Sequence, residues 1–207
     1  MAKESDTPSH YFDADPSTAS RPTPVHIQLQ DLTFDLVADT NVFSNSRLDP
    51  GTRFLLERAP VPVQGDILDL GCGYGAIAVA CAMRSPKCIV HAIDINGRAR
   101  ELAKANAKRL SLTNVFVHDD PATVPTRLSA IYSNPPIRIG KHALHELLIT
   151  WLDRLVPEGH GYIVVSKHLG ADSLARFLAD SGYSVKRLAS HASYRILDIA
   201  ASSKGTL

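Results

Sequence analysis

The periodicity of apolar residues changes near residue 65 of this 207-residue chain. Before that point, segments 25–30 (VHIQLQ) and 32–39 (LTFDLVAD) alternate apolar and polar residues, which is typical of half-buried antiparallel strands. After it, short apolar runs alternate with helical stretches. We predict strands at 65–71, 87–94, 114–120, 128–134, 159–168, 183–190 and 193–202. Helices are predicted at 74–84, 97–110, 141–156 and 170–182.

Alternating strands and helices favour a parallel sheet that is covered on both faces. The last two predicted strands have no helix between them, so we expect them to form an antiparallel hairpin. The predicted fold is therefore α/β, with a doubly wound, Rossmann-like, mostly parallel sheet of seven strands. We expect residues 1–24 to form a flexible arm and residues 25–207 to form one domain. Within that domain, residues 25–60 are predicted to form a β-hairpin and a helix, and residues 61–207 the Rossmann-like core.

Composition excludes several classes of protein. Hydrophobic residues make up 44% and charged residues 21%, and the net charge is +1, so any nucleic-acid surface must be local. The chain has three cysteines, Cys72, Cys81 and Cys88. Their odd number argues against a disulfide framework, and their spacing is not that of a metal site, so we expect buried thiols in a reducing compartment. The N-terminal segment has no apolar stretch typical of a secretory signal, so a cytoplasmic location is expected.

A glycine-rich turn follows the strand at 65–71. The sequence DLGCGYG places Asp69, Gly71 and Gly73 where a strand meets a helix, and Asp94 ends the next strand. The spacing differs from the G-x-G-x-x-G of dinucleotide sites, and Asp69 would repel a pyrophosphate. These features favour S-adenosylmethionine, which is cationic, with Asp94 accepting from the ribose. The alternative is a tight turn with a capping acid.

Two further strand ends carry polar residues. Asp119 and Asp120 follow the third core strand and could accept a hydrogen bond from the adenine amine, or could form a solvated turn. The fourth strand ends at Asn134 and Pro135, beside the first strand in a doubly wound sheet. Two carbonyl acceptors there would hold an exocyclic amine and stabilise positive charge on it without a general base. The alternative is a turn that merely ends the strand.

Basic and histidine residues give weaker signals. Arg138 and Lys141 follow the proline pair and could contact phosphates at the rim of the site. His142 and His145 share a helix face but have no evident third ligand, so no metal site is predicted.

The combination of DLGCGYG, Asp94 and NPPI resembles the class I S-adenosylmethionine-dependent methyltransferases. More narrowly, it resembles the small methyltransferase domain of ribosomal RNA guanine-N2 methyltransferases. The similarity extends upstream to DTNVFSNSRLDPGTRFLL and downstream to SYRIL, so it covers about residues 25–200.

The resemblance implies a role for individual residues. It implies that Asp69, Gly71 and Gly73 hold the methionine part of the cofactor. The remaining cofactor contacts would come from Asp94, Ile95, Phe43 and Asp120, with Asp119 as the alternate to Asp120. It also implies that the target amine is held by Asn134 and Pro135, and the substrate by Pro136, Ile137, Arg138 and Lys141.

The chain departs from related enzymes at Ile137, where an aromatic residue often stacks on the base. Phe43, or Tyr11 and Phe12 of the arm, could supply that stacking instead. The chain is also too short for the second, duplicated domain of the bacterial ribosomal enzymes. We expect an N-methyltransferase for guanine N2 in ribosomal or other structured RNA, acting as a monomer or homodimer away from membranes. The alternatives are a protein glutamine N-methyltransferase and a non-catalytic scaffold that binds cofactor or RNA.

Overall fold

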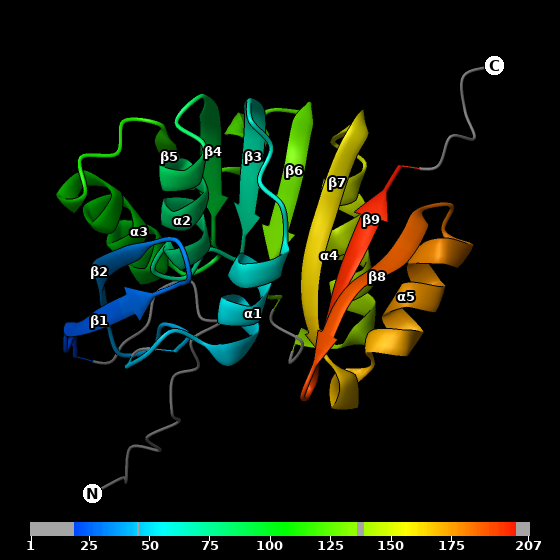
Figure 1. The fold of residues 1–207 in the computed structure, drawn as a ribbon, viewed down its shortest axis with the longest axis horizontal. Helices are drawn as coiled ribbons and strands as arrows, with labels where there is room; N and C mark the ends of the chain where they lie inside the picture. Colours follow the sequence, from blue (N-terminus) through cyan, green and yellow to red (C-terminus); the bar gives the residue numbers. More distant parts are fainter. Residues whose placement is uncertain (1–18, 45, 136–138, 202–207) are drawn as a thin grey trace, which may run out of the picture.

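The computed structural model describes residues 19–44, 46–135 and 139–201 (Figure 1). The strands are β1 (Thr23–Gln28), β2 (Thr33–Ala38), β3 (Gly65–Leu70), β4 (Cys88–Ile93), β5 (Val115–His118), β6 (Leu128–Ser133), β7 (Leu155–Ser166), β8 (Ser184–His191) and β9 (Tyr194–Ala200). The α-helices are α1 (Pro50–Arg58), α2 (Ala76–Arg84), α3 (Gly97–Arg109), α4 (Lys141–Leu152) and α5 (Ala171–Asp180). Two 3₁₀ turns are η1 (Pro121–Thr123) and η3 (Lys167–Leu169).

The main sheet has seven strands in the order β5-β4-β3-β6-β7-β9-β8. The first five of these run parallel to one another, whereas β9 is antiparallel to both β7 and β8. Strand β6 lies beside β3, with Ile67 opposite Ala130, so the chain reverses direction across the sheet between β3 and β6. This arrangement confirms the predicted fold class and the predicted antiparallel hairpin.

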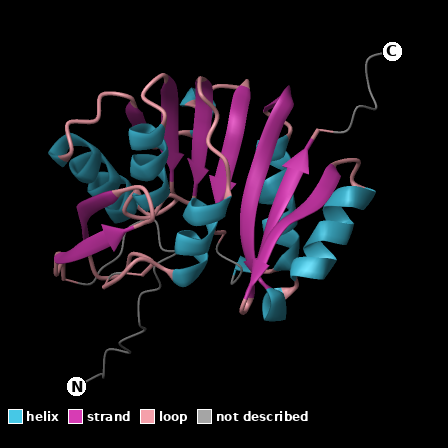
Figure 2. Ribbon diagram, viewed as in Figure 1, coloured by secondary structure: helices cyan, strands magenta, loops and turns pink. Residues whose placement is uncertain are grey.

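Helices cover both faces of the sheet, and the buried residues fall into two clusters accordingly (Figure 2). One face, including Ile67 and Val90, packs against α1, α2 and α3. The other face, including Leu68 and Ile131, packs against α4 and α5. Successive strand residues point to opposite faces, so a parallel strand that is buried on both sides reads as a continuous apolar run.

Strands β1 and β2 form a separate antiparallel hairpin beside the main sheet. Buried Asn106 on α3 joins them to the core, because its side chain exchanges two 2.8 Å hydrogen bonds with the backbone of Val37. The same amide donates to the carbonyl of Tyr74 at 2.8 Å. The hairpin is thus fastened next to the glycine turn.

Some boundaries differ from those predicted. The helix predicted at 141–156 ends at Leu152, because Leu155 already begins β7. Strand β1 begins at Thr23, inside the predicted arm. Pro136, Ile137 and Arg138 lie outside the described residues, as does the arm up to residue 18. No helix in the described part of the chain is long and apolar enough to span a membrane.

Candidate active site

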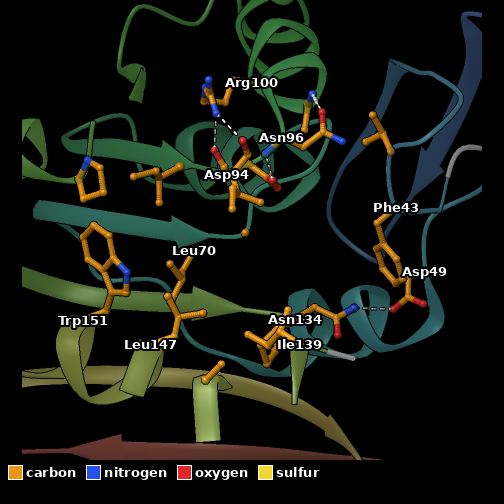
Figure 3. Close-up of a pocket in the computed structure, with 18 of the residues that line it drawn as sticks. Phe43, Asp49, Leu70, Asp94, Asn96, Arg100, Asn134, Ile139, Leu147 and Trp151 are labelled. Carbon is orange, nitrogen blue, oxygen red and sulfur yellow. Dashed lines mark hydrogen bonds between the residues drawn. The ribbon is translucent and has the colours of Figure 1, made fainter. Parts of the chain in front are cut away.

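A cavity of about 980 Å³ opens at the carboxyl ends of β3, β4 and β6 (Figure 3). Its lining includes Gly71, Asp94, Ile95, Asn134 and Pro135, which come from separate segments of the chain. The topology explains their meeting, because the carboxyl ends of neighbouring parallel strands share one edge of the sheet. The structure therefore brings the glycine turn and the end of β6 together.

The glycine turn lets the backbone face the cavity. Gly71 has φ +75°, a conformation that favours glycine, and a Cβ added there would meet no protein atom within 4 Å. Gly75 has φ +90° and lies against α3, where an added Cβ would be 3.1 Å from Cβ of Ala103. The turn thus combines close packing on one side with open space for a ligand on the other.

Asp69 lies beneath this turn and not in the cavity. Its side chain is completely buried, and Oδ2 accepts a hydrogen bond from the backbone N–H of Ala78 at 2.9 Å. Burial raises the pKa of Asp69 to about 8, and the nearby charge of Asp94 adds to the shift. Asp69, predicted to contact the cofactor, thus has its carboxyl under the start of α2 and not on the cavity lining.

Asp94 lines the cavity at the end of β4 and is fixed by its neighbours. Oδ2 accepts from the N–H of Gly73 at 2.9 Å, and Oδ1 accepts from the N–H of Asn96 at 2.9 Å. Arg100 donates to the backbone carbonyl of Asp94 at 2.7 Å. Burial raises the pKa of this carboxyl, and the two N–H donors oppose that effect. Each oxygen retains a lone pair that could accept from a hydroxyl.

Part of the cavity lining is apolar. Ile95, which is 66% exposed, lies on the lining, as do Leu147 and Trp151 of α4. Asp119 also lines the cavity. Asp120, which the resemblance favoured, instead caps η1 by accepting from the N–H of Ala122 at 2.8 Å. Asp119, the predicted alternate, is therefore better placed than Asp120 to contact a ligand in the cavity.

The side chain of Asn134 is held in one orientation. Its Nδ2 donates to Oδ1 of Asp49 at 2.8 Å and to Oγ1 of Thr52 at 3.0 Å (Figure 3). A carboxylate can only accept, so the NH₂ group must face Asp49 and the amide oxygen is left for another donor. Pro135 follows on the cavity lining.

The sequence did not single out Asp49 and Thr52 as site residues. Asp49 is the N-cap of α1 and accepts from the N–H of Thr52 at 2.9 Å, with Pro50 at the first helical position. An Asp-Pro pair is a recognisable helix start, so the cap could have been predicted. The bond to Asn134 could not, because it joins distant parts of the chain.

Two aromatic residues, Phe43 and Tyr194, line the same cavity as Asp49 and Asn134. Phe43 is 40% exposed. Tyr194, at the start of β9, packs against Gly51, where an added Cβ would be 2.8 Å from Cε1 of the ring. Burial and the charge of Asp49 raise the pKa of Tyr194. Lys141 begins α4 as an exposed residue outside the cavity lining.

The match to a family model decides how the chain is classified. The methyltransferase small domain model matches residues 33–198, which is most of the chain. The chain belongs to the methyltransferase small domain family. This assignment confirms the predicted family and, at that level, the predicted methyltransferase activity.

Individual relatives support the same classification. The uncharacterized protein YbxB of Bacillus subtilis (strain 168) is 34% identical over 169 residues, which are 79% of this chain and 84% of YbxB. Ribosomal RNA small subunit methyltransferase C of Shewanella piezotolerans is 34% identical over 133 residues. Those residues are 62% of this chain but only 39% of the Shewanella protein.

Solved structures share the fold. The T. thermophilus 16S rRNA N2 G1207 methyltransferase (RsmC), solved with AdoMet and guanosine, has a TM-score of 0.74 at 21% identity. The match covers 89% of this chain and 51% of RsmC, so this chain spans about half of that protein. The cofactor predicted from the sequence is the one present in that complex.

Proposed function

We propose that this methyltransferase transfers the methyl group of S-adenosylmethionine to an exocyclic base amine, namely guanine N2 of ribosomal or other structured RNA. The observation that carries the proposal is the orientation of Asn134. Asp49 and Thr52 take both of its N–H groups, so its amide oxygen is presented as an acceptor at the cavity.

The residues around the cavity fit the proposed cofactor. Asp94 offers carboxylate oxygens for ribose hydroxyls, and Gly71 leaves open space for the methionine part. Ile95 and Leu147 offer apolar surface to the adenine, and Asp119 offers an acceptor for its amine. When bound, S-adenosylmethionine supplies an electrophilic methyl group on a sulfonium.

The acceptors at the end of β6 suit an amine as the target. An exocyclic NH₂ has two N–H donors, which the side-chain oxygen of Asn134 and the backbone carbonyl of Pro135 could accept. Holding both would aim the nitrogen lone pair and stabilise the positive charge that develops on the nitrogen. The proton can leave after transfer, so the site needs no group dedicated to removing it.

Support for an RNA substrate comes from relatives and from charge. The Shewanella relative and the T. thermophilus structure are both named as ribosomal RNA methyltransferases. The exposed Lys141 begins the helix that follows the Asn134 loop, where it could contact a phosphate. Arg138, predicted to act beside it, lies outside the described residues.

The test is methyl transfer from radiolabelled S-adenosylmethionine to total RNA and, in parallel, to total protein. We expect label in RNA, and digestion of that RNA should give N2-methylguanosine. Label in protein alone, on glutamine amides, would replace RNA with a protein as the substrate. Label in RNA on adenine or cytosine would retain the chemistry and overturn the choice of base. Cofactor binding without transfer to either pool would indicate a scaffold.

A further inference from the structure

We propose that Asp49 determines which base the site accepts, because its carboxylate takes the N1–H of guanine while Asn134 and Pro135 hold the neighbouring 2-amino group. This inference rests on the proposed function in placing an exocyclic base amine at Asn134. It adds a residue that recognises the ring atom beside that amine.

The geometry leaves one oxygen of Asp49 for a ligand. Asp49 is partly exposed and lines the cavity beside Asn134 (Figure 3). Its bonds to the N–H of Thr52 and to the amide of Asn134 both fall on Oδ1, at 2.9 and 2.8 Å. Within the described part of the chain, Oδ2 makes no hydrogen bond. A carboxylate anchored through one oxygen thus presents the other as an acceptor.

The three amine-bearing bases differ at the ring atom next to the amine. In guanine, the 2-amino group is flanked by N1–H, so the edge offers donors side by side. In adenine and cytosine the corresponding ring nitrogen carries a lone pair. A carboxylate has no proton to offer that lone pair, so it attracts guanine and repels the other two bases.

The position of Asp49 is defined on several sides. It caps α1, and Pro50 follows at the first helical position. At Gly51, a Cβ would lie 3.0 Å from Oδ1 of Asp49 and 2.8 Å from the ring of Tyr194. The absence of a side chain at Gly51 therefore lets carboxylate and ring lie together at the same wall. An acceptor held this firmly is suited to discrimination, because it cannot turn away from a mismatched base.

Binding of nucleosides tests the inference separately from catalysis. The probes are guanosine and 2-aminopurine riboside, titrated by NMR into protein that is saturated with S-adenosylhomocysteine. Both nucleosides carry a 2-amino group, but only guanosine has N1–H. We expect the wild-type protein to prefer guanosine by about 10- to 100-fold, as for a lost hydrogen bond to a charged group. Equal affinities would overturn the inference without any variant.

In the variant Asp49→Asn the new side chain has nearly the same shape as the carboxylate, but an NH₂ donor takes the place of one oxygen acceptor. Its Oδ1 can still cap α1 and accept from Asn134, since Asn is as good an N-cap as Asp. Its NH₂ group would replace Oδ2 and face the ring nitrogen. We expect the preference for guanosine to be abolished or reversed, with an unchanged melting temperature. A ratio within a factor of two of wild type would overturn the inference.

Asp35→Asn is the matched control. Asp35 is an exposed β2 carboxylate that pairs with His26 at 2.7 Å, so the variant removes one negative charge away from the cavity. Its nucleoside ratio should equal that of wild type.

Methyl transfer to RNA separates the two possible failures. N2-methylguanosine in RNA, together with an unchanged ratio in Asp49→Asn, would sink only the role of Asp49. Label confined to protein would sink the proposed function and this inference together.

Discussion

Nδ2 of Asn134 lies 2.8 Å from Oδ1 of Asp49, although 85 positions separate the two residues in the chain. The bond joins the end of β6, in the middle of the sheet, to the N-cap of α1, which precedes the sheet. It fixes the orientation of an amide that would otherwise rotate, and a fixed acceptor is what positioning of an amine requires. The residues before β3 therefore form part of the site.

Replacing Asn134 separates cofactor binding from methyl transfer. In Asn134→Ala the side-chain acceptor is lost while the glycine turn and Asp94 remain. We expect affinity for S-adenosylmethionine, measured by calorimetry, to stay within a few-fold of wild type. The rate of methyl transfer should fall by about 10²–10³-fold, as when one preorganised group is removed.

Asn114→Ala is the control for the loss of a structural amide. Asn114 donates to the carbonyls of Ala82 and Cys88, so its loss should lower stability and leave transfer intact at temperatures where the variant is folded. Unchanged turnover in Asn134→Ala would contradict the role proposed for Asn134.

Replacing Asp94, unlike replacing Asn134, should weaken cofactor binding. Asp94→Ala removes the oxygens proposed for the ribose, and it also frees the N–H groups of Gly73 and Asn96. We expect the dissociation constant for S-adenosylmethionine to rise at least about tenfold in calorimetry, as for lost charge-assisted hydrogen bonds. Asp31→Ala breaks a surface ion pair with Arg84 and should leave that constant unchanged. Wild-type affinity in Asp94→Ala would remove Asp94 from the cofactor site.

Tyr194 offers an aromatic surface on the lining of the cavity, against Gly51. Tyr194→Phe keeps the ring against Gly51 and should retain nearly full activity. Tyr194→Ala should raise the KM for RNA about tenfold, in line with the loss of one stacked base, with cofactor affinity unchanged. A wild-type KM in the alanine variant would exclude stacking by this ring.

The buried carboxyl of Asp69 should make stability depend on pH. Its pKa is about 8 in the folded protein because of burial, against about 3.9 in an unfolded chain. The native state therefore binds the extra proton. The stabilising contribution is fully present below about pH 4 and is lost as the pH rises through about 8.

Asp69→Asn can still accept from the N–H of Ala78 but cannot ionise. We expect urea unfolding to show a shallower fall in the free energy of unfolding between pH 4 and pH 8 than in wild type. The difference should be on the order of a few kcal/mol. Parallel curves for the two proteins would show that Asp69 does not titrate in this way.

The sequence predicted the helices, strands and strand ends well, but it predicted poorly which side chains of distant segments contact one another. Apolar runs, glycine positions and the Asp94 and Asn134 strand ends all depend on local patterns, and each came out where it was expected. The sequence did not predict that the Asp69 side chain would be turned away from the cavity lining. Side chains alternate along a strand, so Asp69 points toward α2 whereas Leu70 faces the other side and lines the cavity. Gly71 lines the cavity because it lies in the turn after β3.

The acid proposed for the adenine amine and the hydrogen-bond partners of Asn134 were equally hard to predict from local sequence. Asp119 and Asp120 are adjacent, and only the start of η1 decides that Asp120 caps the turn while Asp119 lines the cavity. Asp49 meets Asn134 because α1 packs across the sheet. No local pattern encodes that packing, since it depends on the shapes of both surfaces.

The wall formed by Tyr194 also has a consequence for biosynthesis. The ring of Tyr194 that packs against Gly51 belongs to β9, the last described strand along the chain, so this wall joins an early segment to a late one. A ribosome that has extruded the chain only through β7 has already delivered the glycine turn, Asp94 and Asn134. The wall formed by Tyr194 is nevertheless missing until β9 emerges, so the cavity is complete only after nearly the whole described chain has been synthesised.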